Sequence, residues 1–226
     1  MNYFRIATLV GLSIAPTPAQ TRLPPGIIQG TVVDINGQPV EGVLVIARQQ
    51  NPQINGVGRQ AWTDSAGRFS IPYLAPNQYR LETRKDKDGY ANSAFPIQTH
   101  IEVPIAEITA LSPTATVQIH LGPKAAYITG SVTDASTGQI IASVRLRIWK
   151  WTDGADRDAE WLMSGQNGNE YGVLIPPNKE VGLAISAPGY ETWTYCGDSG
   201  GTTPTPLNLS SAATKTINVR LRPIPK

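Results

Sequence analysis

The stretch Thr63–Leu81, TDSAGRFSIPYLAPNQYRL, is the most strongly patterned part of the chain and decides the fold. It opens with DSAG, a tight-turn sequence in which the Asp side chain can bond the following backbone and Gly tolerates a positive φ. Apolar residues then alternate with polar ones before and after the segment 72–76, with the period of a half-buried strand. We therefore predict two strands, the first ending at Pro72 because proline cannot donate to a ladder.

Composition favours an all-β protein. The chain has 226 residues, of which 21 are Gly and 19 are Pro, and it lacks long runs of helix-forming residues. Many short strands joined by tight turns have this composition. The formal net charge of +2 is too small to indicate a nucleic-acid partner. The only cysteine, Cys196, excludes an internal disulfide, and the sequence assigns this thiol no role.

The N-terminus has the pattern of a secretory signal. Residues 2–5 carry a positive charge, Ile6–Ala15 is apolar, and small residues follow. The apolar run has the length of a signal peptide and is too short to span a bilayer. We predict a signal peptide over 1–19 with cleavage after Ala19, then a linker over 20–25. A buried N-terminal strand is the alternative, and no later segment is apolar enough for a transmembrane helix.

The pattern of the first hundred residues recurs. Ile28–Asp34 (IQGTVVD) matches Ile128–Asp134 (ITGSVTD), and Thr116–Pro123 matches Thr216–Pro223, both at an offset of 100 residues. A period of this length indicates a duplicated domain rather than a solenoid. A unit of about 100 residues with roughly seven strands has the size of an antiparallel β-sandwich.

These motifs resemble the carboxypeptidase regulatory-like domain, a transthyretin-like sandwich of seven strands. The residues that carry the resemblance are Gly30, Val32, Asp34, Gly37, Pro39, Thr63, Asp64, Gly67, Phe69, Leu74, Pro76, Tyr79 and Leu81. The chain departs from the pattern at Asn77-Gln78, where the family has one Gly. The second copy is more divergent, with Asn167 in place of the turn Asp. The resemblance implies a fold and a non-catalytic role in secreted or cell-surface proteins, and it transfers no catalytic residue.

We therefore expect an all-β protein of two tandem seven-strand antiparallel sandwiches, over residues 26–123 and 124–226. The expected function is that of a secreted, non-enzymatic structural or interaction module at the cell envelope. Its partner would be a protein or polysaccharide at the cell surface, and no cofactor is implied. Sandwiches of this kind host unrelated functions, so the fold alone does not decide among them.

Carbohydrate binding is the second hypothesis. If Leu146 and Ile148 face the core, the period of two places arginine and tryptophan side chains together on the opposite face of the strand. Flat indole rings suit sugar rings, and Arg and Trp are also enriched in protein hot spots. The predicted ligand-binding residues are Arg145, Arg147, Trp149, Trp151 and Trp161. The alternative is that arginine side chains cover the rings, or that this face packs against the first domain.

Hydrolysis is the third and most remote hypothesis. The run CGDSGG around Ser199 resembles the nucleophile loop of trypsin-like proteases, a mechanism that needs a His base held by an Asp. Neither His100 nor His120 lies in the sequence context of that family, so the run is better explained as an ordinary loop. The acidic run 153–158 lacks the ligand spacing of a calcium loop, and the scattered His and Cys do not form a zinc site.

Overall fold

The structure is a computed structural model of the 226-residue chain. The residues it describes are 25–50, 58–93, 103–151, 159–164 (backbone only) and 170–225. The predicted signal peptide and its cleavage site, the acidic run 153–158 and His100 lie outside these residues. The regular secondary structure of the described chain is all strand apart from one short 3-10 helix, η1 (Asp86–Asp88), and the all-β prediction is confirmed.

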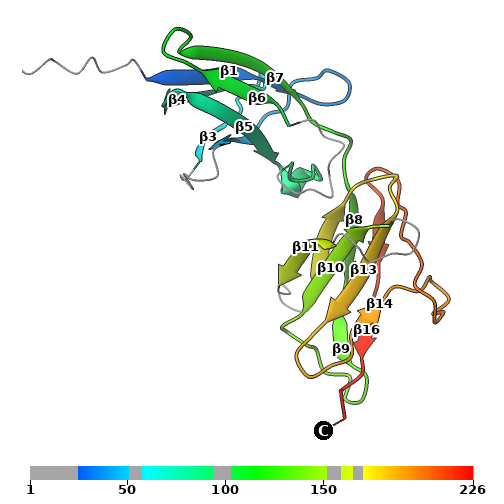
Figure 1. Ribbon diagram of the computed structural model, residues 1–226. Coiled ribbons are helices and arrows are strands. Elements are labelled where there is room, and N and C mark those ends of the chain that lie inside the picture. Colours follow the sequence, from blue (N-terminus) through cyan, green and yellow to red (C-terminus); the bar gives the residue numbers. More distant parts are fainter. Residues whose placement is uncertain (1–24, 51–57, 94–102, 152–158, 165–169, 226) are drawn as a thin grey trace, which may run out of the picture.

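The first seven strands form two sheets, which we call the N-terminal sandwich. The strands are β1 (Gly26–Val33), β2 (Leu44–Gln49), β3 (Arg59–Trp62), β4 (Arg68–Leu74), β5 (Asn77–Arg84), β6 (Ile105–Ile108) and β7 (Thr114–His120). One sheet has the order β4-β1-β7 and the other β3-β2-β5-β6 (Figure 1). Their inward apolar residues make one buried cluster that includes Val43, Val45 and Ala47, which alternate along the chain as residues on one face of a strand do.

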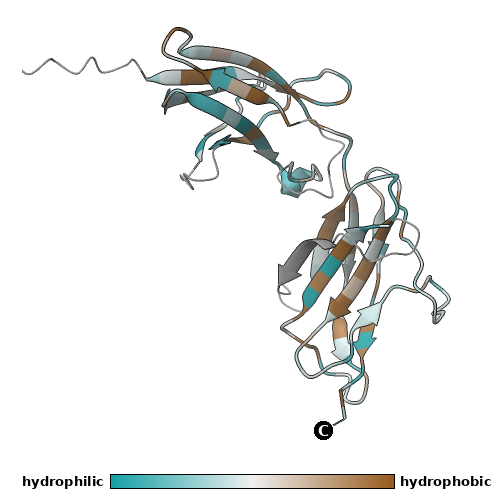
Figure 2. Ribbon diagram, viewed as in Figure 1, coloured by the Kyte–Doolittle hydropathy of each residue, from teal (hydrophilic) through white to brown (hydrophobic). Residues whose placement is uncertain are grey.

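The remaining strands form what we call the C-terminal sandwich. They are β8 (Ala126–Gly130), β9 (Val132–Asp134), β10 (Arg145–Lys150), β11 (Ala159–Ser164), β12 (Tyr171–Ile175), β13 (Val181–Ser186), β14 (Trp193–Thr194), β15 (Thr214–Thr216) and β16 (Val219–Leu221). One sheet has the order β11-β10-β13-β14. The other side is formed by β12-β8-β15 and the pair β16-β9. Apolar and polar residues alternate along β10 (Figure 2), and a second buried cluster fills this sandwich.

The turn at the start of the deciding stretch forms as predicted. The carboxylate Oδ1 of Asp64 accepts hydrogen bonds from the backbone N–H groups of Ala66 (2.9 Å) and Arg68 (2.8 Å), and Gly67 has a φ of +69°. Thr63 is buried, and its hydroxyl accepts from Val43 N (2.8 Å) and donates to Val40 O (2.7 Å). The stretch therefore ties the β3–β4 turn to the segment that leads into β2.

Two features differ from the sequence prediction. Proline does not end the strand, because β4 continues through Pro72 to Leu74. It is an edge strand, where a missing N–H can face solvent, and the register shift between Gly26 and Ile28 absorbs the irregularity. The sheets are also not wholly antiparallel, since β1 pairs with β7 in parallel, as β8 does with β15 and β9 with β16. The first and last strands of each sandwich run the same way, so the chain enters at one end of the sandwich and leaves at the other.

The segment between β7 and β8, which contains Lys124, joins the two sandwiches (Figure 1). Ala125 N donates to Gly89 O (2.8 Å) in the N-terminal sandwich. On the other side, the carbonyl oxygen of Lys124 accepts from Ser211 Oγ (2.8 Å) and Ala212 N (3.3 Å). Hydrogen bonds from both sandwiches therefore hold the connecting segment.

Candidate functional site

The predicted aromatic face on β10 has its central ring buried. Leu146 and Ile148 face the core as expected, but Trp149 on the opposite face is only 4% exposed. The guanidinium carbon of Arg147 lies 5.5 Å from the centroid of the Trp149 ring. Beneath the ring lies Gly182 of β13, where a Cβ would overlap the indole. Arg147 thus covers this ring on one side. Coverage of the rings by arginine is the alternative to carbohydrate binding that the sequence leaves open.

The other predicted ligand residues lie on β10, just after it, or on its neighbour β11. Arg145 is exposed, and Trp151 is half-buried just after β10, with its backbone N–H donating to Glu180 O (3.0 Å). Trp161 is opposite Ile148 in the backbone register, and its side chain lies outside the described residues. Gly182 was the residue that sequence reasoning missed. A lone Gly inside a strand signals close approach of another group, and here that group is an indole.

Two of the large exposed side chains lie instead on the edge strands of the N-terminal sandwich. Trp62 of β3 is 64% exposed and Tyr73 of β4 is 66% exposed. The guanidinium carbon of Arg59 lies 5.8 Å from the centroid of the Tyr73 ring. Tyr73 has a φ of +61°, a left-handed conformation that costs a non-Gly residue roughly 1–2 kcal/mol. A strained backbone that exposes an aromatic ring is a feature often found at functional sites.

Replacing Tyr73 by glycine should stabilise the N-terminal sandwich. Glycine adopts a positive φ without steric cost, and the exposed ring contributes little burial, so we expect a gain of about 1 kcal/mol. Urea unfolding of Tyr73→Gly against wild type measures this gain. Tyr73→Ala, which keeps the left-handed strain, is the matched control and should show no gain. A loss of stability in Tyr73→Gly would show that the ring supports the fold.

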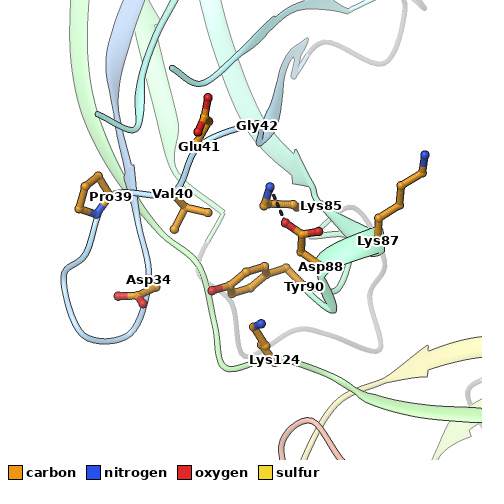
Figure 3. A pocket seen from close by; sticks show the side chains of 10 residues that line it. All are labelled: Asp34, Pro39, Val40, Glu41, Gly42, Lys85, Lys87, Asp88, Tyr90 and Lys124. Carbon is orange, nitrogen blue, oxygen red and sulfur yellow. Dashed lines mark ion pairs between the residues drawn. The ribbon is translucent and has the colours of Figure 1, made fainter. Parts of the chain in front are cut away.

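An open polar groove of about 910 Å³ lies at the end of the N-terminal sandwich that faces the connecting segment. It is lined by the turn after β1, by residues around η1 and by Lys124 (Figure 3). Lys85 Nζ lies 2.7 Å from Asp88 Oδ2, and Lys124 Nζ lies 5.8 Å from the ring centroid of Tyr90. These groups come from three separate segments, and only the fold brings them together.

The groove holds charges of both signs in equal number. Its cations are Lys85, Lys87 and Lys124, and its anions are Asp34, Glu41 and Asp88. Backbone N–H groups, chiefly that of Gln38, lower the pKa of Asp34, and the Lys85 ammonium lowers the pKa of Asp88. Lowered pKa values keep both carboxylates ionised at neutral pH, the opposite of what a general acid requires. The groove therefore presents balanced charges, and the carboxyl groups of Asp34 and Asp88 do not suit the role of a general acid.

In the C-terminal sandwich, the residues that correspond to Asp34 and Tyr90 are Asp134 and Tyr190, and they are hydrogen-bonded to each other. Tyr190 Oη donates to Asp134 Oδ2 (2.9 Å), while Asp134 Oδ1 accepts from the backbone N–H groups of Ser136 (2.6 Å) and Thr137 (2.9 Å). These bonds, that from Thr137 above all, lower the pKa of the Asp134 carboxyl below its ordinary value. The hydrogen bond to Asp134 raises the pKa of Tyr190.

Acid should weaken the C-terminal sandwich through Asp134. Because its folded pKa lies below the unfolded value, the carboxylate stabilises the fold above about pH 4, and this contribution disappears as pH falls through the folded pKa. We expect Asp134→Asn to be less stable than wild type at pH 7 and to lose this deficit at an acid pH below the lowered pKa of Asp134. Urea unfolding at both pH values measures the difference. A deficit of the same size at both would show that charge plays no part.

The loop around Ser199 does not contain a catalytic arrangement among the described residues. Ser199 is exposed, and its neighbour Asp198 accepts from Tyr195 Oη (2.7 Å) and from Lys215 Nζ (2.8 Å). Burial and the bond to Asp198 raise the pKa of Tyr195 to about 12. His120, on β7 of the other sandwich, contacts Gln118 (3.1 Å). The loop is held by a Tyr–Asp–Lys cluster, which has a structural role.

The described part of the chain shows neither a candidate metal site nor a helix that could cross a membrane. It contains no group of three or more His, Cys, Asp or Glu side chains placed to hold a metal ion. None of its helices is long and apolar enough to cross a membrane.

Comparison with known protein families supports the resemblance seen in the motifs. Residues 27–119 match the family model of the carboxypeptidase regulatory-like domain. The matched residues run from β1 to β7, so the match covers the N-terminal sandwich. A comparison with curated proteins gives no match.

Solved structures similar to this one include the Bacillus anthracis TIE protein and two pilins. The Bacillus anthracis TIE protein has a TM-score of 0.32 and 9% identity, over 89% of this chain and 34% of that one. A Streptococcal ancillary pilin has a TM-score of 0.35 and 14% identity, over 89% and 63%. The shaft pilin SpaA from Lactobacillus rhamnosus GG has a TM-score of 0.36 and 9% identity, over 89% and 99%. The chain thus spans about a third of the first protein and under two thirds of the second. At these scores the similarities carry no argument about function.

Proposed function

We propose that this protein is a secreted, non-enzymatic structural and interaction module of the cell envelope. The observation that carries the proposal is the parallel pairing of β1 with β7, which sends the chain in at one end of the sandwich and out at the other. The bonded segment at Lys124 then holds the next sandwich at that exit. A chain built this way is suited to spacing the groups attached to its two ends.

The second sandwich fits the role of a divergent second copy of the same domain, with boundaries at 26–123 and 124–226. Its strand pairing repeats that of the first at an offset of 100 residues, as in Ile27 opposite Thr114 and Tyr127 opposite Thr214. The bond from Ile27 N to Pro113 O (2.8 Å) likewise recurs from Tyr127 N to Ala213 O (2.8 Å). These matches support duplication of a structural unit, and the family match supports a non-catalytic one.

Fractionation of the source cell tests the proposed location. The protein should be found in the secreted, periplasmic or envelope fraction, and N-terminal sequencing should give a mature chain that begins at Gln20. A fluorophosphonate probe applied to the same fraction tests the absence of hydrolase chemistry, with Ser199→Ala as the control. A full-length cytoplasmic chain, or labelling that depends on Ser199, would contradict the proposal.

Carbohydrate binding is a second candidate, favoured by the exposed rings of Trp62 and Tyr73. Affinity electrophoresis in gels that contain a soluble polysaccharide would measure retardation of the full chain. Trp62→Ala and Tyr73→Gly test the exposed rings, and Trp151→Ala tests the face first predicted on β10. Retardation that none of these changes reduces would exclude both surfaces.

A further inference from the structure

The first and last strands of each sandwich are parallel neighbours, and this pairing has a mechanical consequence. In the N-terminal sandwich seven consecutive residue pairs join β1 to β7, from Ile27 opposite Thr114 to Val33 opposite His120. In the C-terminal sandwich β8 pairs with β15, and β9 pairs with β16. We propose that the chain is a load-bearing tether, in which these strand pairs carry tension between its two ends in shear.

The direction of pull decides how the bonds between two strands are loaded. Tension at the N-terminal end draws β1 backwards along its own axis, and tension at the C-terminal end draws β7 forwards. Because the two strands run the same way, these pulls slide one strand past the other. The hydrogen bonds between them are evenly spaced and are all loaded together. In a hairpin pulled from its open end, the bonds would break one after another.

Both strand pairs are bonded at their extremities. In the N-terminal sandwich, Ile27 N donates to Pro113 O (2.8 Å) at one end and Leu121 N to Val33 O (2.8 Å) at the other. In the C-terminal sandwich, Tyr127 N donates to Ala213 O (2.8 Å), and the bond at the other end runs from Ala135 N to Leu221 O (2.9 Å). No frayed end is left from which sequential peeling could start.

The break between β8 and β9 does not interrupt the second strand pair. Ile217 N donates to Thr129 O (2.7 Å), and Val219 N donates to Ser131 O (2.9 Å). The side chain of Asn218 fills the gap, since its Oδ1 accepts from the backbone N–H of Ser131 (3.0 Å). The pairing is therefore continuous from the entry of the C-terminal sandwich to its exit.

The connecting segment should transmit tension between the sandwiches with little extension, because it is hydrogen-bonded to both of them. Gly89 accepts from Ala125 on one side, while Ser211 and Ala212 donate to Lys124 on the other. This inference rests on the proposed structural role and deepens it. A tether that resists shear suits an envelope protein whose two ends are attached to different structures.

Single-molecule pulling on the full chain tests the proposal through two tethers of the N-terminal sandwich. Cys196→Ser first removes the native thiol. One tether joins the N-terminus to the thiol of Pro123→Cys, just beyond β7, and loads the strand pair in shear. The other joins the N-terminus to the thiol of Leu111→Cys, in the turn before β7, and peels β7 from β1. Both attachment residues are exposed, so neither change should disturb the core.

The shear tether should unfold at a force at least about twofold higher than the peeling tether, because the evenly spaced bonds break together rather than singly. Equal forces would overturn the inference. They would leave the proposed envelope location standing, since fractionation tests that separately.

Proline substitutions in β7 give an independent test with a matched control. The alternation of the parallel ladder directs the N–H of Val117 toward β1 and that of Gln118 toward the open edge. Val117→Pro removes a load-bearing bond and should lower the shear force, whereas Gln118→Pro should lower it much less. If Val117→Pro fails to fold, the comparison of the two tethers still tests whether the strand pair is loaded in shear. Equal shear forces in wild type and Val117→Pro would overturn the inference.

Discussion

Replacing Gly30 by alanine should lower the free energy of unfolding of the N-terminal sandwich by at least about 3 kcal/mol. Gly30 lies in the middle of β1, opposite Val117 of β7, and a Cβ there would overlap the carbonyl oxygen of Val117. That oxygen belongs to the backbone and cannot rotate away as the end of a flexible side chain could. The strands must separate to admit a methyl group, and the main parallel pair of the sandwich is weakened.

Urea unfolding followed by hydrogen exchange would measure the loss and assign it to one sandwich. Gly37→Ala is the matched control, since Gly37 has a φ of +75° and open space around it. It should cost only the backbone strain, about 1 kcal/mol. Gly130→Ala should repeat the large effect in the C-terminal sandwich, where a Cβ would overlap Ile217 O. A loss in Gly30→Ala no greater than in Gly37→Ala would show that β1 and β7 can move apart freely.

The glycines at 30 and 130 show what the repeated motif could and could not predict. Alternation and turn chemistry were sufficient to predict strands such as β1, β2 and β7 and the turn at Asp64. The direction of the last strand was not predictable, because local periodicity is the same for parallel and antiparallel pairing. The close approach of β7 to Gly30 is a contact across 87 positions of sequence, and no pattern within either strand encodes it.

The β10 face shows the same limit for the candidate site. The period of two correctly placed Arg147 and Trp149 on the face opposite Ile148. Whether that face meets solvent depends on the neighbouring strands and on what covers them, which periodicity does not report. Trp62 and Tyr73 were not predicted as exposed for the complementary reason. Their exposure follows from the position of β3 and β4 at sheet edges, which is a property of the assembled sheets.

Replacing Trp149 by alanine should lower the free energy of unfolding of the C-terminal sandwich by about 3–5 kcal/mol. The ring is almost fully buried between Arg147 and Gly182, so truncation leaves a large cavity. Trp62→Ala is the matched control, and because that ring is mostly exposed it should change stability by no more than about 0.5 kcal/mol. Urea unfolding of both variants makes the comparison. If Trp149→Ala kept full stability and lost polysaccharide binding, the ring would be a ligand group.

A double-mutant cycle with Gly182 tests the packing directly. In the wild-type background Gly182→Ala forces a methyl group against the rigid indole, and it should cost about 1–3 kcal/mol. In the Trp149→Ala background the same methyl group enters space that the ring has vacated, so its cost should disappear or become a gain. The coupling energy between the two sites should therefore reach at least about 1 kcal/mol. Additive effects would show that the indole does not rest on Gly182. A strong coupling would establish Trp149 as a residue that builds the outer face of the sheet, and would leave the edge strands of the N-terminal sandwich as the place to look for a ligand.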